Sequence, residues 1–332
     1  MTNPPLRLVT KTPKKFYPIN QSALYKIGSK KRLAKILATS LERILLLSNS
    51  SANYKIFCLP EEVCQFTKKV QKARWVQEPK RELRSIHERI QKLLRSIVHP
   101  EYTHAVVKGR SYRTNAAAHK DSARVATFDL RKFYPSTSSS RVREFLVEQM
   151  LCAPDVADLL VKLTCFNGCL PTGSPLSPLL AFYANKPMFE ALNNLAGSHN
   201  LLFTCYVDDL TLSGDVIPIG LPTLVANIAQ RFGHSLSIEK TRLFGRHQHK
   251  HVTGVILYGN ALHVPHTRFL KARAIQEKLL LEKDAVARLK LARKLSGLLG
   301  EAAYLDERYS KLAAKSYVEL KKMNEEAVLP PF

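Results

Sequence analysis

Three aspartates stand where two short apolar segments end. Residues 123–128 form a strand-like run that ends at Asp129, and residues 201–207 form a second run that ends at Asp208 and Asp209. An extended pattern resumes after the pair, so we expect it at the tip of a β-hairpin. Carboxylates on rigid strand ends can hold two divalent cations, which stabilise the attacking and leaving oxygens of an in-line phosphoryl displacement. Asp-Asp is also a common turn dipeptide, so this chemistry depends on what accompanies the pair.

These aspartates belong to a series of three sequence segments. FDLRKFYPS at 128–136 contains the first of them, LPTGSPLSP follows at 170–178, and YVDD at 206–209 contains the pair. In order and spacing the segments resemble the first palm motif, the Pro-Gly loop and the YxDD signature of reverse transcriptases. The resemblance covers roughly residues 25–320. It implies an α+β fold, the right-hand polymerase with fingers, a palm of antiparallel sheet plus helices, and a helical thumb.

Two shorter segments narrow the resemblance. NAAAH at 115–119 precedes the first palm motif, and VTG at 252–254 follows the Asp-Asp pair. They match the NAxxH and VTG signatures and make the chain similar to bacterial retron reverse transcriptases. This resemblance implies RNA-binding roles for Asn115, His119, Thr253 and Gly254. Each segment alone is weak, because a lone histidine is usually a core residue and VTG also fits a turn.

The resemblance implies RNA-directed DNA synthesis with two Mg²⁺ ions. Asp129, Asp208 and Asp209 correspond to the metal-binding carboxylates, and the Leu130 carbonyl corresponds to an additional ligand. Asp209 is expected to serve structure more than metal binding. In the implied reaction a primer hydroxyl attacks the α-phosphate of a dNTP and pyrophosphate leaves. Lys240 resembles the lysine that protonates this leaving group.

The family's dNTP-binding positions correspond here to Arg74, Lys69, Tyr134, Pro171, Thr172 and Gly173. The Arg74 guanidinium suits a triphosphate because its fork binds phosphate oxygens bidentately. Tyr134 takes the place of an aromatic steric gate, which would clash with a ribose 2′-OH. Gly173 would let the backbone approach the nucleotide closely. Thr172 departs from the family, in which Gln is frequent here, and this departure leaves the details of the nucleotide contact open.

The charge of the chain is uneven and favours a polyanionic partner. The 332 residues include 51 Lys+Arg and 27 Asp+Glu, for a formal net charge of +24. Residues 1–120 carry a net charge of +18, residues 121–264 carry +1 and residues 265–332 carry +5. This distribution disfavours a neutral metabolic enzyme and favours a nucleic-acid partner. We expect residues 1–120 to form a basic N-terminal region and fingers, 121–264 a palm with interleaved fingers elements, and 265–332 a helical thumb.

The expected thumb carries basic side chains that could line a nucleic acid, namely Lys271, Arg273, Lys290 and Arg293. Thumbs contact A-form duplexes mainly through shape and backbone. The resemblance implies two nucleic-acid partners, a cognate structured non-coding RNA (msr-msd) and the RNA–DNA hybrid. It also implies priming from an internal 2′-OH, branched msDNA as the product, and anti-phage defence with a separate effector protein. No RNase H domain is recognisable, so we expect host RNase H to remove the template.

Hydrophobic periodicity predicts the elements that must position these residues. Apolar stripes predict helices over residues 31–47, 81–97, 142–163 and 176–196. Beyond residue 266 the pattern is helical, with breaks expected near Gly297 and Gly300. Combined with the short strands, these helices are typical of an α+β middle and a helical tail.

The sequence lacks signals that would take the protein out of the cytoplasm. No apolar run is long enough to span a bilayer and the N-terminus lacks a signal peptide, so we expect a cytoplasmic protein with no membrane partner. The six cysteines include no CxxC pair, which makes a zinc site or a disulfide unexpected. Two alternatives remain open. One is another compact bacterial reverse transcriptase, of diversity-generating or group II intron type, and the other is a catalytically silent RNA-binding protein that kept the fold.

Overall fold

The computed structural model describes residues 16–64 and 70–328. The chain is α+β, with many helices and small antiparallel sheets. It divides into two compact units, each assembled from separate stretches of sequence. Unit 1 comprises Met1–Lys55, Gln77–Pro100 and Thr137–Ala184. Unit 2 comprises Ile56–Val76, Glu101–Ser136 and Asn185–Phe332.

Unit 1 is helical. Its helices are α1 (Lys30–Leu37), α2 (Leu41–Asn49), α3 (Arg81–Leu94), α6 (Ser139–Glu144), α7 (Pro154–Thr164) and α8 (Ser177–Ala184), with a π-helical turn over Phe145–Gln149. Helix α7 packs on α1 and α2, and α8 packs on α3 and α6. The helix predicted over 81–97 is confirmed as α3, which buries Leu83, Ile86 and Ile90. These residues recur at helical spacing, so they share the face that meets the core.

The single helix predicted over 31–47 is wrong, because the segment forms two helices. Helix α1 is closed by Ala38 in a left-handed conformation, with φ 54°. Ser40 then caps α2 by accepting a hydrogen bond from the Arg43 N–H at 3.2 Å. Leu33 and Ile44 of the predicted apolar stripe are both fully buried, whereas Leu45 of the same stripe is exposed. Serine caps a helix start well, since its hydroxyl satisfies a backbone donor that has no partner within the helix.

Two more predicted helices are interrupted. Residues 142–163 are split between α6, the π-helical turn and α7, because Leu151 has a left-handed φ of 51° and Pro154 begins a new helix. Residues 176–196 are split at Asn185, which separates α8 from α9 (Lys186–Ser198) and carries Pro187 into the first turn of α9. Proline is compatible with a first turn but not with a helix interior.

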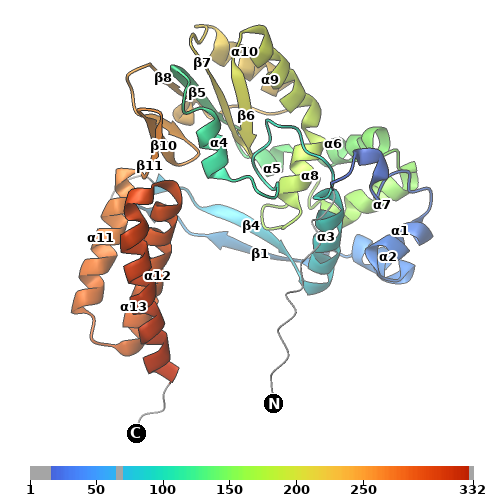
Figure 1. Cartoon of the computed structure of the whole chain (residues 1–332). Helices are drawn as coiled ribbons and strands as arrows, with labels where there is room; N and C mark the ends of the chain where they lie inside the picture. The colour runs from blue at the N-terminus through green and yellow to red at the C-terminus, as the bar shows by residue number, and fades with distance from the viewer. Residues whose placement is uncertain (1–15, 65–69, 329–332) are drawn as a thin grey trace, which may run out of the picture. The chain divides into compact units, whose positions relative to one another are not determined.

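Unit 2 contains a four-stranded antiparallel sheet with strand order β6-β7-β5-β8. The strands are β5 (Arg124–Asp129), β6 (Leu202–Tyr206), β7 (Asp209–Gly214) and β8 (Arg242–Phe244). Both strands predicted to precede the aspartates are confirmed. Helix α9 packs on β6, and α10 (Leu221–Arg231) packs beside α9, as Figure 1 shows. Phe128, Leu210 and Leu212 are buried in this sheet.

A second sheet in unit 2 is three-stranded, in the order β11-β10-β9. Its strands are β9 (Lys250–Val252), β10 (Val255–Tyr258) and β11 (Ala261–His263). Helix α4 (Tyr112–Ala118) packs on β10, where Ala116 shares a core with Val255 and Leu257. Unit 2 also contains α5 (Phe133–Ser136) and the strand pair β2 (Glu62–Val63) and β3 (Val70–Gln71). A further strand pair, β1 (Tyr54–Leu59) and β4 (Arg74–Pro79), has residues in both units.

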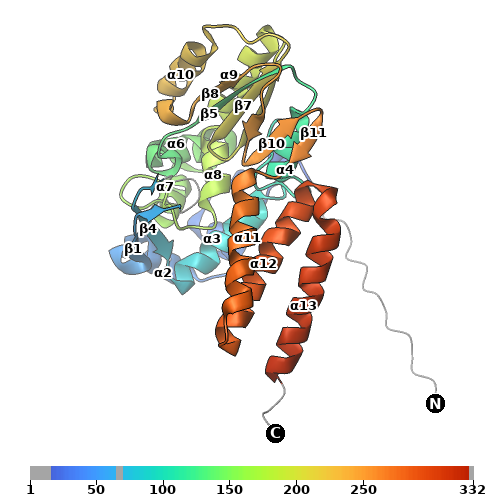
Figure 2. The same ribbon diagram turned by 90° about the vertical axis from the view of Figure 1, so that its left-hand side faces the viewer.

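The C-terminal part of unit 2 consists of α11 (His266–Leu281), α12 (Ala285–Leu305) and α13 (Ser310–Val328). Helix α12 packs against both of the others, and Figure 2 shows the three side by side. The breaks predicted near Gly297 and Gly300 are wrong, since both residues lie inside α12. An interior glycine costs about 1 kcal/mol, which the burial of Leu295 and Leu299 in the packed helices offsets. The chain turns instead at Asp284, which caps α12.

Among the described residues, no helix combines the length and the apolar character that crossing a membrane requires.

Candidate active site

The three predicted aspartates lie together at one end of the four-stranded sheet. Asp129, the last residue of β5, pairs directly with Asp209, the first residue of β7. Tyr206 pairs with Asp209 across the hairpin, so Val207 and Asp208 form its two-residue turn. Val207 has φ 60°, a left-handed conformation that is costly for a β-branched side chain and typical of functional sites. The predicted hairpin tip is therefore confirmed.

Backbone hydrogen bonds hold this end of the sheet in place. The Leu130 N–H donates to the Asp208 carbonyl at 3.0 Å, and the Ser237 N–H donates to the Asp129 carbonyl at 2.8 Å. Leu130 also forms a bridge with Leu236, whose hydrogen bonds are made by the flanking residues. The bridge does not use the Leu130 carbonyl, so this oxygen can serve as the predicted metal ligand.

Lys240 is the cation of the site. Its Nζ donates to Asp129 Oδ2 at 2.7 Å, and its side chain is 64% exposed whereas that of Asp129 is 12% exposed. Burial lowers the pKa of Lys240, but the hydrogen bond to Asp129 and the negative charges of the aspartates outweigh burial and raise it. The ammonium group is therefore held in its charged form.

Burial and neighbouring carboxylates raise the pKa values of two of the three aspartates, Asp208 and Asp209. Burial and, after it, the charges of Asp208 and Asp129 together raise the pKa of Asp209 to about 7, against the opposing charge of Lys240. Burial and the charge of Asp129 also raise the pKa of Asp208. Three acidic groups with one ammonium group form a site that favours additional positive charge.

The donor chemistry of this site suits Mg²⁺, which prefers carboxylate and carbonyl oxygens. Asp129, Asp208 and the Leu130 carbonyl are the groups that would hold the ions. In the ranges 16–64 and 70–328, no three His, Cys, Asp or Glu side chains form a group that could hold a metal as they stand. The donor oxygens thus fit the metal by type and by charge.

Tyr134 lies on α5, five residues after Asp129, and is half-buried. Burial raises the pKa of its phenol and the charge of Asp208 raises it further, which places the phenol near that carboxylate. The neighbouring Phe133 ring contacts the rings of Phe189 and His234, with centroids 6.1 and 5.4 Å apart, and anchors α5. The position of Tyr134 suits a steric gate, and its action as a gate stays a prediction.

The Pro-Gly loop lies in unit 1, where Gln77 of β4 holds it. Thr172 donates to Gln77 Oε1 twice, from its backbone N–H at 3.2 Å and from its Oγ1 at 3.1 Å. The Gly173 N–H donates to the Gln77 carbonyl at 3.2 Å, and Ser177 Oγ donates to the Pro171 carbonyl at 2.6 Å. The sequence motifs missed Gln77, because nothing in the chain marks this residue as a partner of a loop 95 residues away.

Two side chains of α3 hold the next part of the loop. His87 Nε2 donates to the Leu163 carbonyl at 2.7 Å, which leaves Nδ1 to accept the Ser174 hydroxyl at 2.7 Å. Gln91 Nε2 donates to the Pro175 carbonyl at 2.6 Å. Burial lowers the pKa of His87 to about 4, so the ring is neutral at pH 7. These contacts form a buried framework under the loop.

Of the two cations predicted to bind the triphosphate, Arg74 lies within the described ranges. Arg74 begins β4 and is exposed, so its guanidinium is accessible to an anion. Lys69 lies outside the described residues. Triphosphate binding by both side chains stays a prediction.

The two retron-like segments are one packed structure in unit 2. Thr253 and Gly254 form the turn between β9 and β10, with φ values of 45° and 78°. Asn115 Nδ2 donates to Thr253 Oγ1 at 3.4 Å, and that hydroxyl donates to the Tyr112 carbonyl at 3.0 Å. The positive φ of residue 254 favours glycine, and a Cβ there would lie 3.1 Å from Nη2 at the flexible end of Arg268.

Burial corrects part of the RNA-binding prediction. Asn115 and His119 are both fully buried. The His119 ring lies within 2.6 Å of Ser213 Oγ and 2.7 Å of Thr204 Oγ1, so it ties the end of α4 to the sheet. Neither Asn115 nor His119 can touch RNA from inside the core. Their role in this structure is to position α4 and the β9–β10 turn.

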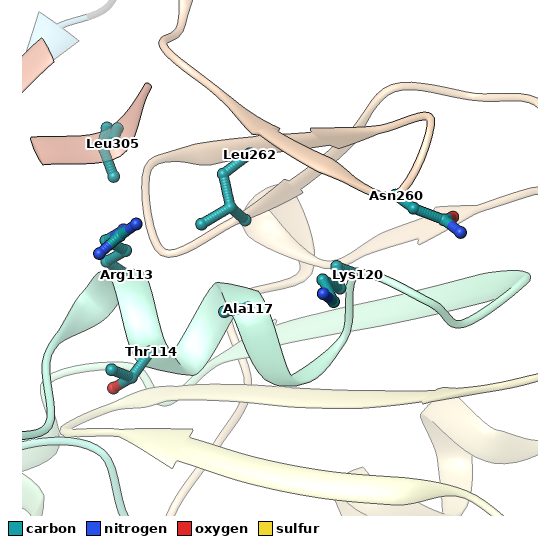
Figure 3. A pocket seen from close by; sticks show the side chains of 7 residues that line it. All are labelled: Arg113, Thr114, Ala117, Lys120, Asn260, Leu262 and Leu305. Carbon is teal, nitrogen blue, oxygen red and sulfur yellow. The ribbon is translucent and has the colours of Figure 1, made fainter. Parts of the chain in front are cut away.

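A cavity of about 420 Å³ lies beside these segments, and Figure 3 shows its lining. Arg113, Thr114, Ala117 and Lys120 line it from α4 and the residues that follow, Asn260 and Leu262 from the β10–β11 hairpin, and Leu305 from α12. Arg113 and Lys120 are exposed. These two cations, rather than the buried Asn115 and His119, are the side chains near NAAAH that a polyanion can reach.

The four basic residues predicted on the thumb are all exposed. Lys271 and Arg273 lie on α11, and Lys290 and Arg293 lie on α12. Arg273 pairs with Glu277 at 3.1 Å, and Arg293 donates to Asn324 Oδ1 at 2.9 Å. Their contact with nucleic acid stays a prediction.

No protein-family profile matches the chain, whereas several curated proteins align with it. Retron Se72 reverse transcriptase of Salmonella heidelberg (strain 579083-10) is 31% identical over 195 residues, which are 57% of this chain and 49% of that protein. Retron Mx65 reverse transcriptase of Myxococcus xanthus is 33% identical over 203 residues, 55% of this chain and 47% of that protein. Retron Ec86 reverse transcriptase of Escherichia coli is 24% identical over 247 residues, 73% of this chain and 75% of that protein. The chain thus spans about half the length of the first two relatives and three quarters of the third.

Proposed function

We propose that the chain, which is similar in sequence to retron reverse transcriptases, is an RNA-directed DNA polymerase that makes DNA on a template RNA. One observation carries the proposal. Asp129 and Asp209 face each other across β5 and β7, and Asp208 lies in the adjoining turn, where burial and the charge of Asp129 raise its pKa. Paired acidic groups at a rigid strand end suit phosphoryl transfer.

Asp129, Asp208 and the Leu130 carbonyl would hold two Mg²⁺ ions, which when bound stabilise charge on the attacking and leaving oxygens. The protein's own residues orient the reaction. Asp209 pairs with Asp129 in the strand register and serves the hairpin more than the metal. Tyr134 would exclude a ribose 2′-OH.

Lys240 has two proposed tasks in this reaction. Its hydrogen bond fixes the Asp129 carboxylate. Its ammonium group stays charged and its side chain is largely exposed, so it can give a proton to the departing pyrophosphate.

We assign the palm to residues 121–264, the helical thumb to 265–332, and the basic N-terminal region and fingers to 1–120. The four-stranded sheet with the aspartates and the three packed C-terminal helices support the first two assignments. The net charge of +18 over residues 1–120 supports a nucleic-acid partner for the third.

The proposed partners are those that the relatives' retron names suggest. The chain would bind a cognate structured RNA (msr-msd), prime from an internal 2′-OH of that RNA, and release branched msDNA in the cytoplasm. Host RNase H would remove the template, and a separate effector would act with the product in anti-phage defence. The exposed cations Arg113 and Lys120 and the basic side chains of α11 and α12 support RNA and hybrid binding.

Polymerase activity is tested by dTTP incorporation on poly(rA)/oligo(dT). Asp208→Asn keeps the shape of the side chain and removes its charge, so we expect at least about a 100-fold loss of rate, as for loss of other transition-state charge stabilisers. Asp215→Asn is the matched control, because Asp215 is exposed and follows the opposite end of β7. Equal incorporation by the wild type and Asp208→Asn would refute the catalytic assignment.

The retron assignment is tested on protein purified after expression of the gene with its flanking DNA. Co-purified DNA that debranching enzyme separates from RNA supports 2′-OH priming. Unbranched cDNA instead indicates another compact bacterial reverse transcriptase. RNA without any DNA indicates a silent RNA-binding protein, provided that the poly(rA) assay is also negative.

A further inference from the structure

Gln77 makes three hydrogen bonds to two consecutive residues of the Pro-Gly loop. The Thr172 N–H can only donate, so the atom of the Gln77 amide that faces it is the oxygen Oε1. The Thr172 hydroxyl donates to the same oxygen, and the Gly173 N–H donates to the Gln77 backbone carbonyl. Both donors of Thr172 are therefore directed at the protein rather than at a nucleotide.

We infer that Gln77 is a positioning residue for dNTP binding, which acts by holding the backbone of Thr172 and Gly173. The inference rests on the proposed polymerase function. Thr172 is too short to contact a nucleotide as a glutamine would, and its hydroxyl is used in the bond to Gln77. The loop contributes its backbone shape, and Gln77 maintains that shape.

The contacts of the loop are divided between two supports. Ser174 and Pro175 are held by His87 and Gln91 of α3. Thr172 and Gly173 are held by Gln77 of β4. Removal of the Gln77 amide should therefore loosen the first part of the loop and leave the second part in place.

The partial burial of Gln77 and Thr172 determines whether this loosening affects stability or nucleotide affinity. Gln77 and Thr172 are half-buried, so water can satisfy the released donors in a variant. Stability should change little, because the lost hydrogen bonds are replaced by bonds to solvent. The geometry of the loop is not restored by water, so nucleotide affinity should fall.

Gln77→Met tests the inference, because methionine preserves length and removes the acceptor. In primer extension on poly(rA)/oligo(dT), we expect KM for dTTP to rise about 5- to 10-fold, the worth of about one net hydrogen bond, with kcat within about twofold. Gln230→Met on α10 is the matched control, since Gln230 is exposed, lies outside unit 1 and should leave both constants unchanged.

A double-mutant cycle tests whether Gln77 acts through Thr172. Thr172→Val removes only the hydroxyl donor and should raise KM about threefold in the wild-type background. In the Gln77→Met background the same change should have no further effect, because its acceptor is already absent. An equal effect of Thr172→Val in both backgrounds would overturn the inference.

Amide hydrogen exchange gives a readout that does not require activity. Gln77→Met should speed exchange at Thr172, whereas Gln77→Glu, which keeps an oxygen facing the N–H, should preserve protection. Unchanged Thr172 exchange in Gln77→Met, or a KM within twofold of the wild type, would overturn the inference. A wild-type protein that incorporates no dTTP ends the proposed function instead, while exchange still tests the contact. If Gln77→Met does not fold, Thr172→Val alone carries the test.

Discussion

Replacement of His119 by glutamine should make the stability of the protein less sensitive to acid. The His119 ring is fully buried, and both of its nitrogens lie within hydrogen-bond distance of hydroxyls, Ser213 Oγ at 2.6 Å and Thr204 Oγ1 at 2.7 Å. Burial and, to a lesser extent, the nearby His104 together lower the pKa of His119 to about 3. The folded protein therefore keeps this ring neutral throughout the mildly acidic range.

The sign and size of the effect follow from this shift. An unfolded histidine has a pKa of about 6.5. Between that value and pH 3 the unfolded chain binds a proton that the folded chain does not, so acidification favours unfolding. From pH 7 to pH 5 the loss is about 2 kcal/mol for this one group, at 1.36 kcal/mol for each pH unit below 6.5.

Other groups also titrate, so the difference between variants is the informative quantity. Asp209 acts in the opposite direction, because its folded-state pKa of about 7 lies above the usual carboxyl range. Its folded form binds a proton between pH 7 and pH 5, which offsets part of the histidine effect. His87 of unit 1, with a pKa of about 4, acts in the same direction as His119.

Urea unfolding followed by circular dichroism at pH 7 and pH 5 supplies the measurement. Glutamine keeps a donor and an acceptor but does not titrate, so His119→Gln should lose about 2 kcal/mol less stability than the wild type over this interval. His87→Gln should behave alike, because the folded-state pKa of His87, about 4, also lies far below that of an unfolded histidine. A His119→Gln protein that loses as much stability as the wild type would refute the reasoning.

Three further results are expected. Tyr134→Ala should raise the efficiency of rNTP use relative to dNTP use by about 10-fold or more, since the half-buried ring near Asp208 is the predicted gate; an unchanged ratio in single-nucleotide primer extension would exclude it. The double variant Arg113→Ser, Lys120→Ser should bind RNA more weakly. In filter binding, the slope of log Kd against log salt should fall by about 1.4 to 1.8, because each lost phosphate contact contributes about 0.7 to 0.9. An unchanged slope would show that the two cations do not contact phosphate. Trp75 is the single tryptophan and is 63% exposed on β4, so oligo(rU) that stacks there should quench the protein's fluorescence; constant emission at saturating RNA would contradict that site.

Local sequence patterns were sufficient for the parts of the site that depend on neighbouring residues. Short apolar, strand-like runs predict strands that end at Asp129 and before Asp208, and the strand register confirms both. The Asp-Asp pair follows one strand and precedes another, so a hairpin tip is the simplest arrangement. The order of the motifs was likewise sufficient to indicate the reverse transcriptase relatives that the comparisons identify.

Helix ends depended on more than the local pattern. Ala38 lies within a helical stripe yet adopts a left-handed conformation, and Gly297 lies inside a continuous helix. Propensities for single residues amount to about 1 kcal/mol or less. Packing of a helix face against its neighbours contributes more, so packing decides where a helix ends or continues.

Burial and distant pairings required the folded chain. The NAxxH motif implies that His119 binds RNA, but in the folded chain its ring hydrogen-bonds the hydroxyls of Thr204 and Ser213 in the sheet. Thr172 meets Gln77 across 95 residues of sequence. Contacts of this kind arise when the core brings distant segments together, and no local periodicity records them. The residue types of the site and the strand ends that carry them could therefore be predicted from the sequence. Tertiary packing alone determined which residues hold the Pro-Gly loop and that the histidine of NAAAH is buried.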